Sequence, residues 1–307
     1  MKINPVYKKE LKISVRTVKM AFIIFFYNLL LAIIGLFAFY LSFEESAMYG
    51  GIDYSNMLSI YTTIAVLEIC LVLFIVPGFT SSSITGERER QTLEILLTTK
   101  LKPIEIVLGK LGSSISSLLL LVFSSLPILA ISFAVGGIRF IDLLQLMLLA
   151  IVIAVFIGSI GIFFSTIARK TTSATVFTYG TVIVLILGTA AIVFAAYLLI
   201  SFKMGKQYAA GGVYNAPDVG NLILILLVNP IVTMIAMITD QFGNYSEFSK
   251  ILSEYGKGNS TIIENWFVVS VILQLVLSVV FILGAAKFLN PLRKRRRGRG
   301  KRDSLEG

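Results

Sequence analysis

Histidine is absent from the 307-residue chain, and Cys70 is its only cysteine. These absences exclude disulfides within the chain, zinc sites built from cysteine and histidine, and nucleophilic catalysis with a histidine base. The phosphate-binding pattern G-x-x-x-x-G-K-[ST] is also absent, because Gly109-Lys110, Gly205-Lys206 and Gly256-Lys257 lack the upstream glycine and the following hydroxyl. We therefore expect no metal site and no nucleotide site in this chain, and any ATP that powers it must bind another subunit.

Charge is scarce as well. Only 14% of the residues are charged, 56% are hydrophobic, and the mean hydropathy is +0.88. A soluble domain carries about 25% charged residues, so this composition indicates an integral membrane protein. The net charge of +10 would be compatible with nucleic-acid binding, but most of the excess lies in the N-terminal segment and in the tail from Arg293, beside apolar segments. We therefore interpret it as membrane-flanking charge and expect no nucleic-acid partner.

Six apolar segments are long enough to cross a bilayer, which takes about 20 helical residues. We expect spans at about residues 20–43, 57–79, 109–135, 141–167, 172–202 and 266–288. The predicted fold is an all-α integral membrane protein, with a single transmembrane domain over residues 1–290 and a polybasic tail over 291–307.

The distribution of basic residues predicts the orientation of the chain. They gather at the N-terminus, in the loop after the second span, at Arg169-Lys170 and in the tail, which places both termini in the cytoplasm and requires an even number of spans. Residues 221–240 are apolar, but Asn229-Pro230 interrupts them. A seventh span there would put the basic tail outside the cell. We therefore predict a re-entrant hairpin on the outer side of a multi-pass plasma-membrane protein.

Two basic segments are expected to lie against lipid headgroups. Residues 3–19 have the spacing of an amphipathic interfacial helix, with Lys8, Lys12 and Arg16 on one face. The helix is either a simple headgroup anchor or a lever that joins the membrane domain to a cytoplasmic partner. The tail directly follows the last span and should bind anionic lipids at about 1 kcal/mol per basic residue. Its first basic residues are Arg293, Lys294, Arg295 and Arg296.

The stretch from Ser81 to Lys110 is the only long run in the first two-thirds of the chain with dense charge of both signs. Residues 87–97 contain neither proline nor glycine, which predicts one helix. In such a helix Glu87 faces Arg90, and Arg90 faces Glu94. An apolar stripe follows the same helix: Leu93, Leu96 and Leu97, with Leu101 beyond. The alternative is a polar connector with surface ion pairs worth under about 1 kcal/mol each.

This stretch carries a family resemblance. The sequence T-G-E-R-E-R-Q-T-L-E-I-L-L-T-T from Thr85, followed by P-I-E-I-V-L-G-K from Pro103, resembles the segment after the second span in permeases of exporter-class ATP-binding-cassette (ABC) transporters. The resemblance in motif covers about 30 residues. The resemblance in layout covers the whole chain, from the interfacial helix through six spans and the re-entrant region.

The resemblance implies a function in which the chain itself does no catalysis. In that family the segment is a coupling helix, seated in a groove of a separate ATPase subunit that binds ATP and magnesium. The resemblance also implies a second permease subunit, identical or related, and export of a substrate from the cytoplasm or inner leaflet. Carried over by position, the ATPase interface would comprise Glu87, Arg88, Glu89, Arg90, Thr92, Leu93 and Glu94.

Two residues depart from the family pattern. Gln91 stands where glycine is common, and we expect it to stiffen the coupling helix. Lys102 stands before Pro103 where a capping serine is usual, so we expect the start of the third span to be less firmly fixed.

Polar residues within the spans are candidates for a substrate route. Glu68 lies in the middle of the second span, where an ionisable group costs several kcal/mol unless it faces protein or water. It either lines a route or is a protonated acid hydrogen-bonded to a neighbouring helix. Asn28 and Gln274 are weaker candidates of the same kind. Small residues stripe the third and fourth spans, for packing within the subunit or for a dimer or pathway surface.

Two other functions remain open at this stage. One is a transporter or channel that works on an ion gradient without an ATPase. The other is a membrane scaffold that recruits a cytoplasmic protein through the same charged loop. An intramembrane hydrolase is disfavoured, because no paired aspartates, histidines or serine–lysine dyad stand at span centres.

Overall fold

The computed structural model describes residues 6–8, 10, 17–49, 54–98, 101–135, 138–209, 217–243, 245–256 and 260–289. Over these residues the secondary structure is helical and contains no strand. The prediction of an all-α protein is confirmed.

The chain forms long helices joined by short connections. In order they are α2 (Val18–Tyr49), α3 (Tyr54–Ser81), α4 (Thr85–Glu89), α5 (Leu93–Thr98), α6 (Pro103–Val135), α7 (Phe140–Ile167), α8 (Thr171–Ile183), the π-helical turn η1 (Val184–Gly188), α9 (Thr189–Ala209), the 3₁₀ helix η2 (Gly220–Val228), α10 (Pro230–Gln241), α11 (Tyr245–Tyr255), α12 (Ser260–Glu264) and α13 (Trp266–Leu289).

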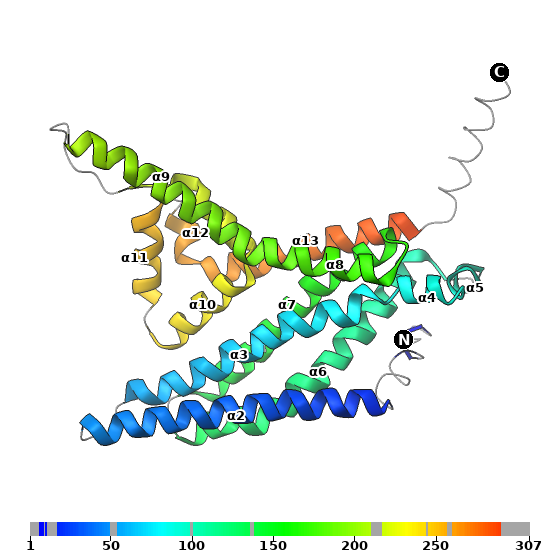
Figure 1. Cartoon of the computed structure of the whole chain (residues 1–307), viewed down its shortest axis with the longest axis horizontal. Helices are drawn as coiled ribbons and strands as arrows, with labels where there is room; N and C mark the ends of the chain where they lie inside the picture. The colour runs from blue at the N-terminus through cyan, green and yellow to red at the C-terminus, as the bar shows by residue number, and fades with distance from the viewer. Residues whose placement is uncertain are drawn as a thin grey trace.

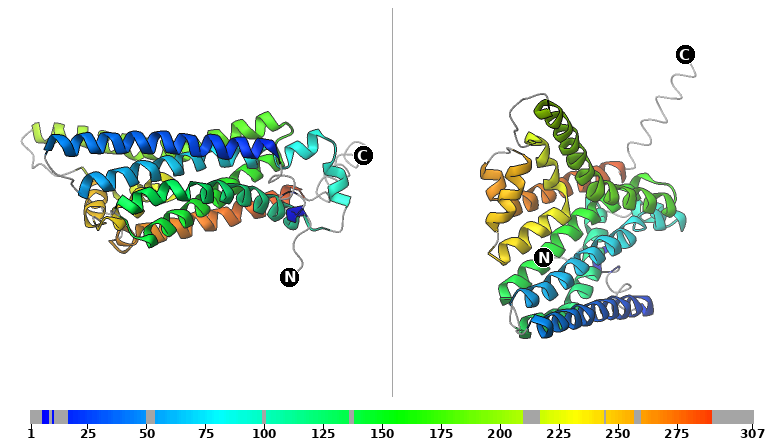
Figure 2. Two further views of the ribbon diagram at one scale, coloured as in Figure 1. Left: turned by 90° about the horizontal axis from the view of Figure 1, so that it is seen from below. Right: turned by 60° about the vertical axis from the view of Figure 1, so that its left-hand side comes forward.

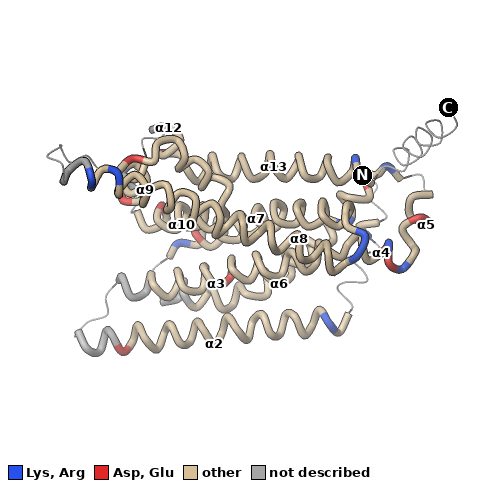
Figure 3. Tube along the Cα trace, turned by 45° about the horizontal axis from the view of Figure 1, so that its top comes forward, with Lys and Arg blue, Asp and Glu red and all other residues tan. Residues whose placement is uncertain are grey.

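Six helical segments of the described chain are long and apolar enough to cross a membrane, as predicted. They are α2, α3, α6, α7, the continuous segment from α8 through η1 to α9, and α13. Helices α2, α3, α6, α7 and α13 pack together along the length of the molecule, whereas α9 diverges from them (Figures 1 and 2). Lysine, arginine, aspartate and glutamate gather at the two ends of this bundle and are almost missing between them (Figure 3). Charged ends with very few ionisable residues between them are the distribution that a bilayer requires.

Helix α7 forms the core of the bundle. In the most apolar stretch of α7, 72% is buried, compared with 6% in that of the fifth span. Helix α7 packs against α13, α3, α6 and α8. Glycines allow its close contact with α3: a Cβ on Gly161 would overlap Thr80, and one on Gly158 would meet Leu111 of α6 at 3.0 Å. The small-residue stripe of the fourth span therefore packs within this chain.

The apolar segment after the fifth span is broken at Asn229-Pro230, as predicted. Helices η2 and α10 meet there at 94°. Asn229 stabilises the bend from both sides, since its Oδ1 accepts from the backbone N–H groups of Ile231 and Val232, and its Nδ2 donates to Thr189 Oγ1 at 2.9 Å. Pro230 takes the first helical position, where its missing N–H costs nothing. The entry of this pair from the outer side stays a prediction.

Both predicted lipid-binding segments fall largely outside the described residues. In the predicted interfacial helix, Val6–Lys8 is helical, with Val6 buried and Lys8 exposed. Lys12, Arg16 and the tail residues Arg293, Lys294, Arg295 and Arg296 lie outside the described ranges.

Candidate functional site

The charged stretch lies at one end of the bundle, where α4 and α5 connect α3 to α6 (Figure 1). The first turn of α2 and the last turn of α13 lie at this same end, whereas α10, α11 and α12 lie at the other (Figures 1 and 2). This arrangement agrees with an even number of spans.

The prediction of one helix over residues 87–97 is wrong. Helix α4 ends at Glu89, α5 begins at Leu93, and Gln91 between them has φ = 59°. A left-handed residue cannot continue a right-handed helix, so the chain turns here.

The expected stiffening by Gln91 is wrong for the same reason. Glycine adopts positive φ at no steric cost, which explains physically why it suits this position. Glutamine carries a Cβ into the left-handed region and leaves a strained turn rather than a firmer helix.

Helix α4 is capped by another helix. Its own N-cap residue, Ile84, makes no side-chain cap. Instead, the backbone N–H groups of Ile84 and Thr85 donate to Ser165 Oγ of α7, at 2.9 and 3.0 Å. Ser165 is fully buried, so α7 fixes the position where α4 starts.

Arg88 and Glu89 hold α4 across the junction between α7 and α8. The Arg88 guanidinium donates to the carbonyl oxygens of Thr166, at 2.9 Å, and Ala168, at the C-terminal end of α7. The Glu89 carboxylate accepts from the backbone N–H and the hydroxyl of Thr171, at 2.7 and 2.9 Å, at the first residue of α8. A cation thus meets a helix C-terminus and an anion a helix N-terminus, which is the favourable pairing with both helix dipoles.

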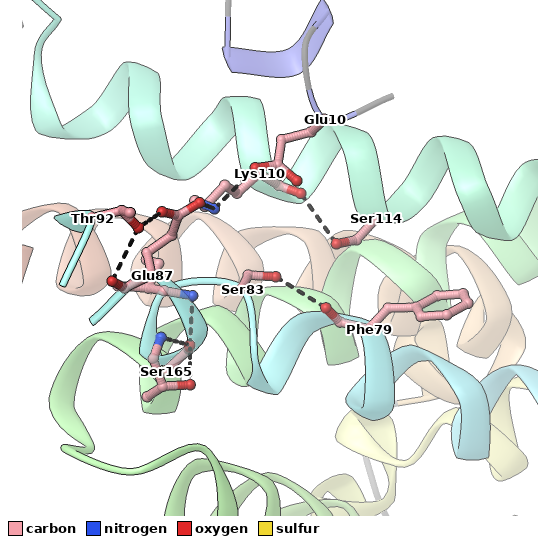
Figure 4. Close-up of polar contacts among 10 residues, drawn as sticks. Glu10, Phe79, Ser83, Glu87, Thr92, Lys110, Ser114 and Ser165 are labelled. Atoms are coloured by element: carbon pink, nitrogen blue, oxygen red, sulfur yellow. Dashed lines mark hydrogen bonds and ion pairs between the residues drawn. The ribbon is translucent and has the colours of Figure 1, made fainter. Parts of the chain in front are cut away.

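Glu87 connects α4 to α6 and to the N-terminal segment. Its Oε1 lies 3.4 Å from Lys110 Nζ, and the same ammonium lies 3.3 Å from Glu10 Oε1 (Figure 4). Thr92 donates to the Glu87 side chain and carbonyl oxygen, closing the turn at Gln91. The predicted pairing of Glu87 with Arg90 assumed an unbroken helix, and the structure pairs Glu87 with Lys110 instead. We name Glu10, Lys110 and Glu87 the Lys110 bridge.

The start of α6 is capped from within the helix. The backbone N–H of Lys102 donates to Glu105 Oε2 at 2.9 Å. This is the returning half of a capping box, in which the third helical residue caps the N-cap residue. The expectation that Lys102 leaves this helix start poorly fixed is therefore wrong.

The loop has an inner apolar face and an outer polar one. Leu93 is buried in a cluster with residues of α6, α7 and α13, and Leu96, Leu97 and Leu101 pack against it. The outer surface consists of Arg90, Gln91, Glu94 and Ile95, all exposed, with Ile95 68% exposed. We name these residues the outer face.

The predicted interface residues therefore divide between two surfaces. Arg90 and Glu94 are exposed on the outer face, and Glu89 is exposed but bound to Thr171. Arg88 and Thr92 are half-buried and Leu93 is buried, so these side chains serve the attachment of the loop to the bundle.

A polar cavity of about 450 Å³ lies between the loop, α6 and the N-terminal segment. Serines of α6 and of the turn after α3 line it, together with Glu87, Arg90 and Lys110. The third-span stripe borders this cavity and the N-terminal segment, where Ser116 Oγ lies 2.9 Å from the Tyr7 hydroxyl.

The three intramembrane candidates do not form one site. Glu68 is fully buried and accepts from Ser125 Oγ at 2.9 Å and from the Tyr27 hydroxyl at 3.5 Å. Asn28 Nδ2 donates to the adjacent Ser124 Oγ at 2.8 Å, so it shares the interface of α2, α3 and α6 with Glu68. Gln274 lies elsewhere: its Nε2 donates to Thr233 Oγ1 of α10 at 2.8 Å.

Sequence reasoning missed four contributors to the loop: Ser165, Thr171, Lys110 and Ile95. Ser165 belongs to the small-residue stripe of the fourth span, and nothing in that stripe indicates that it caps a helix 80 positions away in sequence. A usable signal existed for Lys110, a lysine among the serines at the start of an apolar span. Ile95 falls outside the leucine stripe, and this spacing places it on the other face.

Comparison with protein families gives a single clear result. A family model described as "ABC-2 family transporter protein" matches residues 4–291, nearly the whole chain. A comparison with curated proteins found no match. The match covers every span, the loop of α4 and α5, and the bent pair of η2 and α10. The chain therefore belongs to the ABC-2 family of transporter membrane proteins.

Proposed function

We propose that this chain is the permease subunit of an ABC exporter, driven by ATP hydrolysis on a separate subunit that docks on α4 and α5. It pairs with a second permease, identical or related, in the plasma membrane, with both termini cytoplasmic. ATP and magnesium bind the partner, and this chain does no catalysis. The family match supports the permease assignment, and the loop supports the docking site.

The construction of the loop is the observation that carries this proposal. Its inner side is bonded to three helices at once. The N–H of Ile84 donates to Ser165 of α7, Arg88 and Glu89 bond to the adjoining ends of α7 and α8, and Glu87 pairs with Lys110 of α6. A mere connector needs no such attachment. A surface that receives force needs it, because displacement of α4 must reach the spans without being lost in a flexible loop.

The force path runs through two connections. Arg88 and Glu89 carry motion of α4 into the junction of α7 and α8. The Lys110 bridge carries it into α6 and the N-terminal segment. Closure of the ATPase would then shift the spans together and switch the transporter between inward-facing and outward-facing states. On this view the N-terminal segment is a lever rather than a simple anchor.

The outer face has the chemistry of a docking surface. Arg90 and Glu94 present opposite charges to water beside the exposed Ile95. Paired charges around a central apolar side chain favour a specific protein contact over a lipid one.

Two other parts of the chain meet the membrane in this proposal. The basic residues of the N-terminal segment and tail contact lipid headgroups. The bent pair of η2 and α10 enters the membrane from the outer side.

Charge reversal on the outer face tests the proposal. The tagged protein carrying Arg90→Glu and Glu94→Lys is purified from native membranes, and the accompanying ATPase is identified by mass spectrometry and measured by ATP hydrolysis. We expect loss of the ATPase from the variant while its membrane insertion is unchanged. The matched control is Lys250→Glu on α11, an exposed charge at the other end of the molecule.

Unchanged ATPase recovery with the double variant would contradict the docking site. Transport by the purified chain alone in proteoliposomes, on an ion gradient and without any ATPase, would instead establish the gradient-driven alternative. Recruitment of a partner without transport of any kind would establish the scaffold.

A further inference from the structure

The polar cavity between the loop, α6 and the N-terminal segment has the size and the lining of a ligand site. Its volume of about 450 Å³ lies within the range of small-molecule sites, about 300–1,000 Å³. Figure 4 shows Lys110 and Ser114 of α6 on one side, and Phe79 of α3 and Ser83 of the following turn on the other. Hydroxyl groups line much of it: Ser82, Ser83, Thr92, Ser113, Ser114 and Ser117.

The charges of the described residues that line this cavity cancel. Arg90 and Lys110 are cations, and Glu10 and Glu87 are anions. Lys110 is 4% exposed and contacts both carboxylates, which leaves one of its three N–H donors for a ligand. The Arg90 guanidinium makes no hydrogen bond or ion pair with the described residues. A ligand that carries one charge of each sign therefore matches the cavity better than a net anion or cation.

Ser113 indicates a ligand independently of these charges. Its side chain is only 6% exposed and lines the cavity, and its hydroxyl has no hydrogen-bond partner among the described residues. The hydroxyls of Ser83 and Ser114 donate to backbone carbonyl oxygens of Phe79 and Lys110, so they offer the cavity acceptor oxygens. A buried hydroxyl is costly unless it is hydrogen-bonded, so the cavity favours a ligand that donates hydrogen bonds.

The cavity lies inside the ends of two candidate spans. Its residues between 79 and 87 belong to the span Leu58–Glu89, and those between 110 and 117 belong to Pro103–Ile131. Both stretches lie at the end of the bundle where α4 and α5 carry their charges (Figure 3). A bilayer places its headgroups at this level, between its hydrocarbon and the water.

An apolar crevice between α3 and α6 adjoins the cavity toward the middle of the bundle. Val76, Ile115 and Leu118 line this crevice, which shares Phe79 and Ser114 with the cavity. Polar walls that give way to apolar ones suit an amphiphile, whose charged head stays among polar groups while its apolar part avoids water.

We propose that the cavity binds the phosphoethanolamine head of a membrane phospholipid, with the phosphate against Arg90 and Lys110 and the ammonium against Glu10 and Ser113. A guanidinium donates paired hydrogen bonds to a phosphate, and a primary ammonium supplies the donors that carboxylate and serine oxygens accept. A phosphocholine head has the same charges but no N–H donor, and a phosphoglycerol head lacks the cation. That this lipid is the exported cargo rests on the proposed function, whereas its binding does not.

Binding is tested on the purified full-length chain without an ATPase and with Arg90 unchanged, so the result is independent of the docking test. Dioleoyl phosphatidylethanolamine, phosphatidylcholine and phosphatidylglycerol are titrated separately, and native mass spectrometry gives the affinity for each. We expect phosphatidylethanolamine to bind at least about tenfold more tightly than phosphatidylcholine. Ser113→Leu fills the cavity and should weaken phosphatidylethanolamine binding at least about tenfold. The matched control is Ser253→Leu, exposed on α11 at the other end of the molecule, which should bind like the unchanged chain.

Glu10→Gln tests the charge balance, because it leaves the cavity with one cation in excess. Phosphatidylethanolamine binding should weaken and phosphatidylglycerol binding should strengthen, each by at least about threefold. The basic tail binds phosphatidylglycerol in every variant, so the comparison is with the unchanged chain for the same lipid. A purely structural role of Glu10 would weaken the binding of both lipids instead.

Equal affinity for phosphatidylethanolamine and phosphatidylcholine would overturn the proposal. Unchanged phosphatidylethanolamine binding by Ser113→Leu would overturn the placement in this cavity, and equal loss of both lipids in Glu10→Gln would overturn the charge-balance argument. If Ser113→Leu does not fold, the headgroup comparison and Glu10→Gln decide the matter.

A soluble competitor distinguishes the lipid from a free zwitterion with the same head. Glycerophosphoethanolamine lacks acyl chains and should displace the lipid only at an excess of at least about 100-fold. Displacement at equal concentration would overturn the lipid as the source of the head and assign the cavity to a soluble zwitterion.

Discussion

Replacement of Lys110 by methionine should loosen the cytoplasmic end of the bundle, where one ammonium holds two carboxylates. Lys110 is 4% exposed, while Glu10 and Glu87 are 32% and 24% exposed. Methionine keeps most of the length and volume of the side chain and removes the ammonium group. Both carboxylates then face the polar cavity without their shared cation.

The magnitude follows from the geometry. At 3.3 and 3.4 Å each pair has a gross attraction of about 5 kcal/mol, taking an effective dielectric constant of about 20. Desolvation of the lysine cancels much of this, since breaking a fully buried pair costs about 3–5 kcal/mol and exposed pairs contribute about 0–1 kcal/mol. With one partner buried and two partly exposed, we expect Lys110→Met to cost about 2 kcal/mol of unfolding free energy.

The assay is reversible unfolding in mixed detergent micelles, with Lys102→Met as the matched control. Lys102 is exposed at the start of the same helix, so its replacement should cost under about 0.5 kcal/mol. A double-mutant cycle with Glu87→Gln should give a coupling energy of about 1 kcal/mol with Lys110→Met. Strict additivity, or equal stability of Lys110→Met and the unchanged chain, would refute the Lys110 bridge as a structural connection.

Three further substitutions test the loop and its packing. Gln91→Gly should raise the unfolding free energy by about 0.5 kcal/mol, because glycine relieves the positive φ while adding unfolded-state entropy; a loss of stability in the same unfolding assay would contradict the turn. Ser165→Ala should cost about 1–2 kcal/mol and speed hydrogen exchange of the first α4 amides, as loss of an N-cap does, and unchanged exchange there would exclude the cap. Gly161→Ala should lower the unfolding free energy by at least about 1 kcal/mol in thermal unfolding, because the added Cβ overlaps Thr80. The control Gly180→Ala places a Cβ with no atom within 4 Å and should be neutral or stabilising. Equal effects of the two substitutions would argue against the close contact of α3 and α7.

The positions of the candidate spans could be predicted from the sequence, because the ability to cross a membrane depends on the apolar length of each segment and not on its neighbours in the fold. About 20 apolar residues in a row satisfy the bilayer wherever they stand, so composition alone located all six. The break at Asn229-Pro230 was readable because asparagine caps a helix start and proline takes its first position. Proline alone does not end a span here, since Pro77 and Pro127 lie inside α3 and α6.

The hydrogen bonds and ion pairs that attach the loop of α4 and α5 to the bundle could not be predicted from the sequence. One helix over residues 87–97 was a fair inference from a run without proline or glycine, and it failed because tertiary contacts outweigh propensity in short helices. Ser165 fixes the start of α4, Lys110 draws Glu87 toward α6, and the chain accepts a strained Gln91 to reach both. None of these partners lies within one helical turn of the residue it holds.

By itself, the sequence determined that six segments are long and apolar enough to cross a membrane, and that a charged loop follows the second. These features depend on hydropathy and on the sign of charge, which each segment carries regardless of its neighbours. Only the tertiary structure decided which loop residues bind inward and which face out, and that Glu68 and Asn28 share the interface of α2, α3 and α6 while Gln274 lies elsewhere. Those decisions depend on which helix lies against which, and the packing of α7 at the centre of the bundle sets them.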